Sequence, residues 1–135
     1  MTSSGLDIEV LGIDMLVPDA PTALEVSELC VLALASAGIE EGHMAVEFVD
    51  AERIQVLNRQ YRQIDSPTDV LSFGVDEDGD SAGPRELGDV VICPEHTADL
   101  REAVVHGTLH LTGMDHEVDD GEMLALQAEL MRWIQ

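Results

Sequence analysis

The stretch HGTLHLTGMDH, residues 106–116, places three of the five histidines of the chain within eleven positions. His106 and His110 are four residues apart, so on a helix they share a face with Cβ atoms about 5–6 Å apart. Gly113 can end that helix, because glycine readily adopts the left-handed conformation found at helix ends. The chain can then turn and bring His116 back to the same ion. Three protein ligands with an open position are typical of a catalytic zinc site.

The same spacing, H-x-x-x-H-x-x-G-x-x-H, occurs in the metzincin proteases. Those enzymes require a glutamate directly after the first histidine, as the general base that acts on the water at the metal. Position 107 of this chain is a glycine. The sequence therefore predicts a metal site formed by His106, His110 and His116, and it argues against a peptidase of the metzincin type.

The composition is that of one globular domain. The chain has 135 residues, 45% of them apolar, which is enough for a buried core. No apolar run approaches the roughly 20 residues of a membrane span, and the N-terminus lacks the basic and apolar regions of a signal peptide. Cys30 and Cys93 lie far apart in apolar surroundings, which predicts buried free thiols. We expect a cytoplasmic protein that makes no membrane contact.

The charge is strongly acidic. The chain carries 28 acidic residues, six arginines and no lysine, for a net charge of −22. Such a surface keeps a protein soluble and repels polyanions. Two explanations are open: a composition that suits a high-salt cell or a lysine-poor genome, and a cationic partner. Arg53, Arg59 and Arg62 fall within ten residues on one predicted helix, and this local positive charge would favour an anionic substrate.

Hydrophobic periodicity predicts alternating strands and helices. Strands are expected at residues 6–11, 44–49, 69–73 and 88–92. Helices are expected at about residues 21–37, 50–62, 95–112 and 120–134. The first strand–helix–strand unit implies a parallel pair with a right-handed crossover, and the last two strands can form a hairpin or join a mixed sheet. The predicted class is α+β: a single domain with a roughly four-stranded mixed sheet covered by helices. The metal site lies on a helix of the C-terminal half and on the turn after it.

The same patterns select core residues on two of the helices. The helix at 50–62 is expected to place Ile54, Leu57 and Tyr61 on one face. The last helix is expected to bury one row of side chains: Met123, Leu126 or Gln127, Leu130 and Ile134.

Three other features are weaker candidates for sites. The acidic run at 76–87 begins like a calcium loop, but its sixth position is Ser81 and its twelfth is Leu87, so we interpret it as a solvated loop. His96 precedes His106 by ten residues, about 15 Å along one helix, and should not join the metal. The sequence suggests no partner for His43.

Two further residues have both a structural and a functional interpretation. Arg62 ends a predicted helix, where a cation suits the negative end of the dipole, but it could also contact a phosphate through two hydrogen bonds. Asp115 and Glu117 flank His116. They could serve local turn formation, or a carboxylate there could orient an imidazole or act as a base near the metal-bound water.

The run at 106–116 resembles the H-G-x-L-H-L-x-G-x-D-H signature of the YbeY family, bacterial endoribonucleases and ribosomal RNA maturation factors. Residues 58–73 are similar to that family's N-x-x-Y-R-x-x-D-x-P-T-D-V-L-S-F block. Residues 87–92 are similar to its L-G-D-I-x-I strand. The motifs stand in family order and extend from about residue 45 to 134. One clear departure is that the segment from Cys93 to Val105, before the first histidine, is shorter than in the family. A minor change is Met114, where the family usually has tyrosine or a similar residue.

The resemblance implies one zinc ion per chain, bound by His106, His110 and His116, with Arg62 facing the site. It implies a single YbeY-like domain over residues 1–135 that cleaves single-stranded RNA. It also implies a part in small-subunit ribosomal RNA maturation and ribosome quality control, with RNA as the partner. Because the charge opposes binding of free RNA, delivery would depend on the ribosome, on a ribosomal or assembly-factor protein, or on a salty medium.

The leading hypothesis is metal-assisted hydrolysis of RNA phosphodiesters. The zinc would lower the pKa of a water molecule toward about 7 and polarise a phosphoryl oxygen. Arg62 would hold the phosphate, and Asp115 is a candidate for orienting a histidine or handling a proton. Two alternatives are open. The chain could be a non-catalytic ribosome-assembly factor with a structural zinc, or a zinc hydrolase that acts on a substrate other than RNA.

Overall fold

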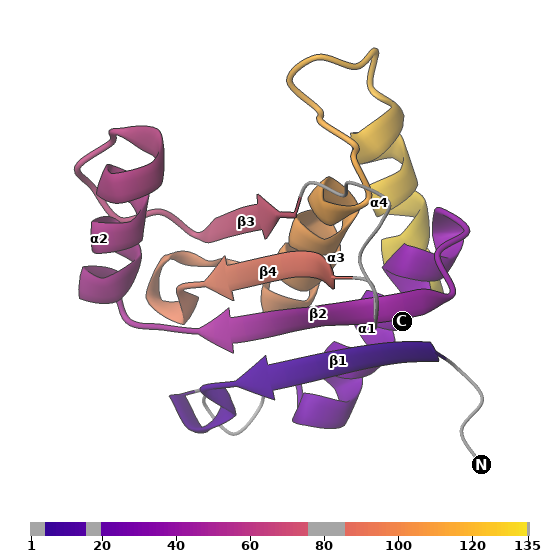
Figure 1. Cartoon of the computed structure of the whole chain (residues 1–135), viewed down its shortest axis with the longest axis horizontal. Coiled ribbons are helices and arrows are strands. Elements are labelled where there is room, and N and C mark those ends of the chain that lie inside the picture. Colours follow the sequence, from indigo (N-terminus) through magenta and orange to yellow (C-terminus); the bar gives the residue numbers. More distant parts are fainter. Residues whose placement is uncertain (1–4, 16–19, 76–85, 135) are drawn as a thin grey trace.

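The structure, a computed structural model, describes residues 5–15, 20–75 and 86–134. The first half contains β1 (Gly5–Leu11), the 3-10 helix η1 (Ile13–Met15), α1 (Ala23–Ser36), β2 (Glu41–Phe48) and α2 (Ala51–Arg62). The second half contains β3 (Val70–Gly74), β4 (Glu86–Ile92), the 3-10 helix η2 (Pro94–His96), α3 (Leu100–Leu111) and α4 (Glu122–Trp133). The predicted order of strands and helices is confirmed (Figure 1).

The four strands form one mixed sheet in the order β1-β2-β4-β3. β1 pairs in parallel with β2, as the strand–helix–strand pattern predicts, and β2 pairs in parallel with β4. β3 runs antiparallel to β4, with Ser72 opposite Val90. The last two strands are therefore both neighbours and part of a mixed sheet, and the predicted α+β class is confirmed.

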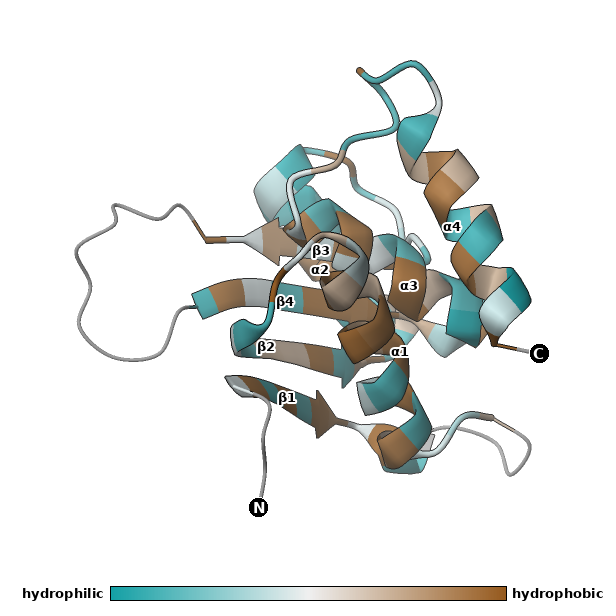
Figure 2. Ribbon diagram, turned by 90° about the vertical axis from the view of Figure 1, so that its right-hand side faces the viewer, coloured by the Kyte–Doolittle hydropathy of each residue, from teal (hydrophilic) through white to brown (hydrophobic). Residues whose placement is uncertain are grey.

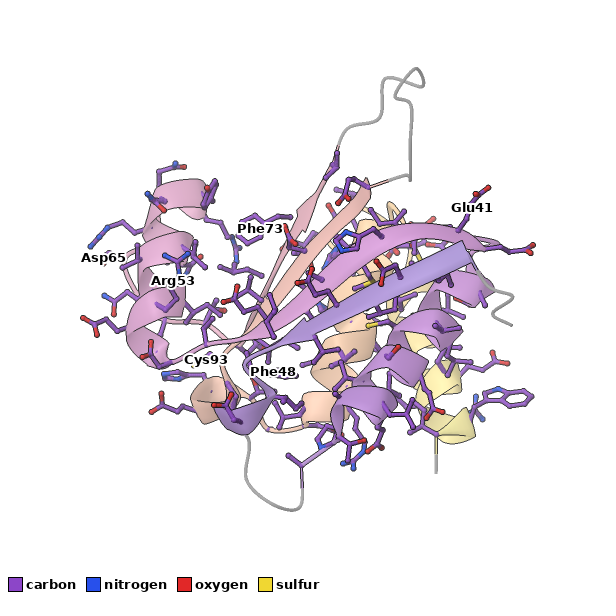
Figure 3. The ribbon with its side chains drawn as sticks, turned by 60° about the horizontal axis from the view of Figure 1, so that its bottom comes forward. Glu41, Phe48, Arg53, Asp65, Phe73 and Cys93 are labelled. Carbon is purple, nitrogen blue, oxygen red and sulfur yellow. The ribbon has the colours of Figure 1, made fainter. Side chains whose placement is uncertain are left out.

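Two hydrophobic clusters cover opposite faces of the sheet, because successive side chains of a strand point to opposite sides. On β4, Val90 and Ile92 belong to the larger cluster, which includes α1 and α3. Val91, which lies between them, belongs to the smaller cluster formed with α2. Figures 1 and 3 show α2 at one end of the sheet, away from the other helices. In Figure 2, α4 lies outside α3, on the side away from the sheet.

The helix that carries the first two histidines begins later than predicted. It starts at Leu100 rather than near residue 95, because the Asp99 side chain caps it by accepting a hydrogen bond from the Glu102 N–H at 3.1 Å. Upstream, Thr97 Oγ1 donates to the carbonyl of Cys93 at 2.7 Å and stabilises the separate turn η2. His96 therefore lies on η2 and not on the helix of His106.

The predicted apolar faces of α2 and α4 supply core residues, but one member of the α2 face is exposed. Ile54 and Leu57 are buried, but Tyr61, on the same predicted face, is 62% exposed. On α4 the buried side chains are Met123, Gln127 and Leu130, whereas Leu126 and Ile134 are partly buried.

Cys30 and Cys93 are buried free thiols, as predicted. Burial raises the pKa of the Cys30 thiol to about 12, so it stays protonated and inert. Of the acidic run at 76–87, residues 76–85 lie outside the described residues, and Leu87 is buried in β4. Among the described helices, none has both the length and the apolar character needed to cross a membrane.

Candidate metal centre

The three histidines of the central motif come together, as their spacing predicts. His106 and His110 occupy one face of α3, and Gly113, with a φ of 102°, turns the chain so that His116 returns to them. The ring centroids lie 4.9 Å apart for His106 and His110, 5.1 Å for His106 and His116, and 5.2 Å for His110 and His116. One nitrogen of each ring lies within 4.8 Å of the others, so the cluster can hold a metal ion.

Hydrogen bonds fix the orientation of two of the rings. Nδ1 of His106 lies 2.7 Å from Oε1 of Gln127 on α4, and Nδ1 of His110 lies 3.0 Å from the carbonyl oxygen of Met114. Both oxygens are acceptors, so each Nδ1 carries the proton and donates it. Nε2 of each ring is then unprotonated and available to a metal. Partners of this kind set the tautomer of metal-binding histidines in proteins generally.

The protonation state also suits a cation. The pKa of His110 is lowered, first by burial and then by the neighbouring charge of His106. A neutral imidazole is the form that binds metals, so burial favours the binding form before any ion arrives. Ligand nitrogens on one zinc ion, each about 2.0–2.1 Å from it, are no more than about 4.2 Å apart. The three nitrogens therefore lie close to the spacing that one zinc ion requires.

The donor set leaves room for a further ligand. Among the described residues, the side chains close enough together to bind one metal ion are these three histidines. No carboxylate or thiolate belongs to the group. Imidazole donors suit zinc, copper, nickel and iron. Three ligands and an open position are the arrangement found where a metal activates water or a substrate, whereas structural zinc sites are closed by four ligands.

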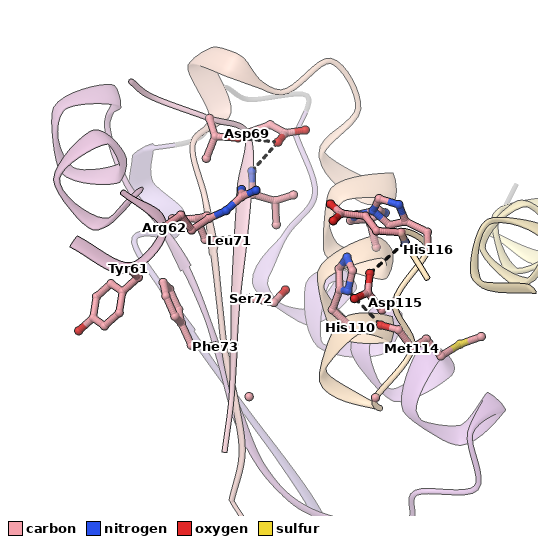
Figure 4. A pocket seen from close by; sticks show the side chains of 16 residues that line it. Tyr61, Arg62, Asp69, Leu71, Ser72, Phe73, His110, Met114, Asp115 and His116 are labelled. Atoms are coloured by element: carbon pink, nitrogen blue, oxygen red, sulfur yellow. Dashed lines mark hydrogen bonds between the residues drawn. The ribbon is translucent and has the colours of Figure 1, made fainter. Parts of the chain in front are cut away.

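The cluster forms one wall of a cleft of about 750 Å³. The facing wall comes from the end of α2 and from β3 with the residues before it. In Figure 4, Arg62 and Asp69 lie on that facing wall, across from His110 and His116. Arg62, chosen from the sequence as a candidate, therefore lines the same cleft as the histidines.

Gly107 shows how α3 is held against the sheet. Ser72 Oγ of β3 donates a hydrogen bond to the Gly107 carbonyl at 3.0 Å, which ties the two walls of the cleft together. A Cβ at position 107 would lie 2.5 Å from Cγ1 of Val90 and 3.2 Å from Ser72 Oγ. A side chain here would point into the sheet rather than toward the histidines. This geometry explains why position 107 cannot carry the base of a metzincin protease.

The remaining candidates differ in their placement. Asp115 lines the cleft and is exposed, and its Oδ1 accepts a hydrogen bond from the Glu117 N–H at 3.0 Å. His96 lies on η2 and is not part of the cluster. His43 has partners that the sequence did not suggest: Glu9 Oε1 lies 3.4 Å from its Nε2 and Glu86 Oε2 lies 3.1 Å from its Nδ1.

Three contributors to the site were not predicted as such. The helical periodicity predicts Gln127 only as a core position, although a buried amide on an amphipathic helix is a signal that it has a polar partner. Ser72 and Tyr61 belong to the motif block at 58–73, but no sequence pattern distinguishes a side chain that lines a cleft from one that faces solvent.

Comparison with known proteins agrees with these observations. The profile of the family described as Endoribonuclease YbeY matches residues 21–135. Proteins named Endoribonuclease YbeY include one from Geobacillus thermodenitrificans, 42% identical over 82% of this chain and 86% of that protein. Another, from Azorhizobium caulinodans, is 40% identical over 90% of this chain and 91% of that protein.

A solved structure is similar as well. The solution structure of the protein TM1509 from Thermotoga maritima is 27% identical in sequence, with a TM-score of 0.52. The match covers 94% of this chain and 88% of that one. Together with the family profile and the relatives, it leads to one conclusion: the chain belongs to the YbeY family.

Proposed function

We propose that this chain is a zinc-dependent endoribonuclease that hydrolyses phosphodiester bonds of single-stranded RNA. One observation carries the proposal: the three histidines form a metal-ligand group without a fourth protein ligand among the described residues, in a cleft that Arg62 also lines. The name shared by the relatives, Endoribonuclease YbeY, supports RNA as the substrate. We assign His106, His110 and His116 as the zinc ligands and residues 1–135 as one catalytic domain.

The residues of the cleft would bind the phosphate, orient the metal ligands and transfer protons. When bound, zinc supplies a Lewis acid that lowers the pKa of water toward about 7 and polarises a phosphoryl oxygen. Arg62 would hold the phosphate across the cleft through its planar guanidinium and would stabilise the negative charge that grows in the transition state. Gln127 and the Met114 carbonyl would keep the His106 and His110 rings in the binding tautomer.

We assign Asp115 to proton handling beside the ligands. It is exposed to the cleft next to His116, and the hydrogen bond from Glu117 N–H holds one of its oxygens in place. The second oxygen can accept a proton from the attacking water or a hydrogen bond from an imidazole. Position 107 cannot supply such a base, because its side chain would face Val90 in the sheet.

We place the activity in the cytoplasm, in maturation of small-subunit ribosomal RNA and in ribosome quality control. The net charge of −22 supports delivery of RNA by the ribosome or by a ribosomal or assembly-factor protein. Affinity for free RNA normally depends on many lysines and arginines that displace counterions from phosphates. A chain with six arginines and no lysine lacks that source of affinity.

A cleavage assay on matched RNAs tests the proposal. One RNA is offered as a single strand and as a duplex, to protein as purified, after chelation, and after chelation followed by zinc. We expect cleavage of the single strand by the first and third samples and none after chelation. Zinc bound at one ion per chain without cleavage at any salt concentration would favour a ribosome-assembly factor with a structural metal. Cleavage that survives complete metal removal would contradict the proposal.

A further inference from the structure

An aromatic pair forms part of the cleft wall opposite the histidines. Tyr61, at the end of α2, is 62% exposed. Its ring centroid lies 5.0 Å from that of Phe73 on β3, with 63° between the ring planes. Both residues line the cleft that contains Arg62 and the three histidines, and Figure 4 shows the two rings next to each other.

The exposure of Tyr61 is not explained by packing. Ile54 and Leu57 precede it on the same helical face and are buried at 0% and 9% exposure, so the helical pattern alone would bury Tyr61 as well. The ring instead meets Phe73 in an edge arrangement and leaves most of its surface to solvent. The whole chain has only one tyrosine, one tryptophan and two phenylalanines. Two of these four rings lie together on the wall of one cleft.

Proteins bind unpaired nucleobases by stacking them on aromatic rings, because every base has a flat face, while a nearby cation contacts the phosphate. We propose that Tyr61, supported by Phe73, is a base-stacking platform for a nucleotide whose neighbouring phosphate is held by Arg62. This inference rests on the proposed function and makes it more specific, because the platform selects unpaired bases. A base inside a duplex has both faces covered by its neighbours and cannot lie on the ring.

The charges of the cleft give stacking a particular importance here. Among the described residues that line it, Arg62 is the one permanent cation, against the carboxylates of Asp69, Asp115 and Glu117. Counterion release from phosphates can therefore contribute little to affinity. Stacking does not depend on phosphate neutralisation, so it supplies affinity that persists at high salt.

Fluorescence of a short single-stranded RNA that carries 2-aminopurine tests the platform, because stacking on a ring quenches this base. Binding is followed by stopped flow before cleavage, with the metal-loaded wild type, Tyr61→Ala and Tyr61→Phe. Trp133→Ala is the matched control: Trp133 is 75% exposed and lies beside Arg132 in a separate depression of the surface. A duplex of the same sequence is run in parallel.

We expect the wild type, Tyr61→Phe and Trp133→Ala to quench the probe and to bind with similar Kd values. Tyr61→Ala should lose the quenching and bind about 5- to 150-fold more weakly, the range that follows from removing one stacked base. The loss of affinity in Tyr61→Ala should be the same at low and high salt. The duplex should not quench the probe through Tyr61.

Three results would overturn the proposal in different ways. If the wild type cuts RNA but Tyr61→Ala binds and quenches as well as the wild type does, the platform is absent and the nuclease function stands. If the wild type neither binds nor cuts RNA, the proposed function fails and the platform fails with it. Should Tyr61→Ala unfold, Tyr61→Phe decides: it keeps the ring, so a large loss of binding by this variant also contradicts stacking.

Discussion

Oε1 of Gln127 lies 2.7 Å from Nδ1 of His106, and this contact joins the last helix of the chain to the first residue of the metal cluster. Gln127 is buried at 9% exposure, so the interaction is shielded from water. The amide oxygen can only accept, which keeps the proton on Nδ1 and leaves Nε2 free for the ion. α4 therefore takes part in the site although it contributes no ligand.

Replacing Gln127 by Leu should weaken zinc binding about 10- to 100-fold, the usual effect of removing a residue that orients a ligand. Gln127→Glu should retain most of the affinity, because a carboxylate accepts the same hydrogen bond. Chelator competition measures the zinc Kd of each variant, and Gln60→Leu on the exposed face of α2 is the control. Equal Kd values for Gln127→Leu and the wild type would show that the contact does not orient His106.

Gly107→Ala should destabilise the fold. The added Cβ would lie 2.5 Å from Val90 Cγ1, and the strand behind it is buried, so α3 or Val90 must move. Overpacking of this kind costs about 1–3 kcal/mol in the free energy of unfolding, which denaturant titration measures.

Gly113→Ala tests the other glycine of the motif: its Cβ would meet nothing within 4 Å, but its φ of 102° is strained for alanine. An unchanged unfolding midpoint for Gly107→Ala would contradict the close contact between α3 and β4.

Arg62→Ala should lower kcat for RNA cleavage about 100- to 1,000-fold while leaving zinc content unchanged, if the guanidinium stabilises charge in the transition state as we propose. Arg62→Lys should recover only part of the rate, because an ammonium cannot form the planar two-bond contact. Arg59→Ala is the matched control: Arg59 lies on the same helix, 3.6 Å from Asp65, and does not line the cleft. Equal losses from Arg59 and Arg62 would indicate general electrostatics rather than a specific phosphate contact.

His43 should make the stability of the sheet depend on pH. Its pKa is raised, mainly by the hydrogen bond to Glu86, with smaller contributions from Glu9 and Asp7. A histidine with a raised folded-state pKa stabilises the fold fully below its unfolded value of about 6.5, and the effect disappears as pH rises through the folded value. The wild type should therefore exceed His43→Gln in unfolding free energy by more at about pH 5.5 than at about pH 8.5.

The control for this comparison is His96→Gln, because His96 is exposed on η2. It controls for the general effect of replacing a surface histidine by glutamine. A difference between His43→Gln and the wild type that is the same at both pH values would mean that His43 gains nothing from its carboxylate neighbours when it is protonated.

Local patterns were sufficient to predict the four strands, the parallel pairing of the first two, and the histidine cluster. Alternating residues mark β1, and four-residue spacing followed by Gly113 brings His116 back to α3. The start of α3 was placed too early, because residues 95–99 are compatible with helix until the hydrogen bonds of Thr97 and Asp99 are considered. Side-chain capping competes with helix extension, and periodicity does not report it.

The parts of the site that escaped prediction depend on contacts between distant segments. Tyr61 continues the apolar row of α2 but is exposed, and only the three-dimensional arrangement shows that its ring lies against Phe73. Gln127 lies 21 residues beyond His106, so no spacing rule relates them. The assignment of Arg62 to the cleft came from the resemblance of its motif block to the YbeY family, and not from periodicity.

The most direct test of the central claim is to measure zinc content and RNA cleavage on the same preparations of wild type, His110→Ala and His96→Ala. His96 is the matched control, a histidine on η2 outside the cluster. The account predicts about one zinc per chain and cleavage of single-stranded RNA in the wild type and His96→Ala, with both lost in a folded His110→Ala. Metal-dependent cleavage that persists in pure His110→Ala would contradict it.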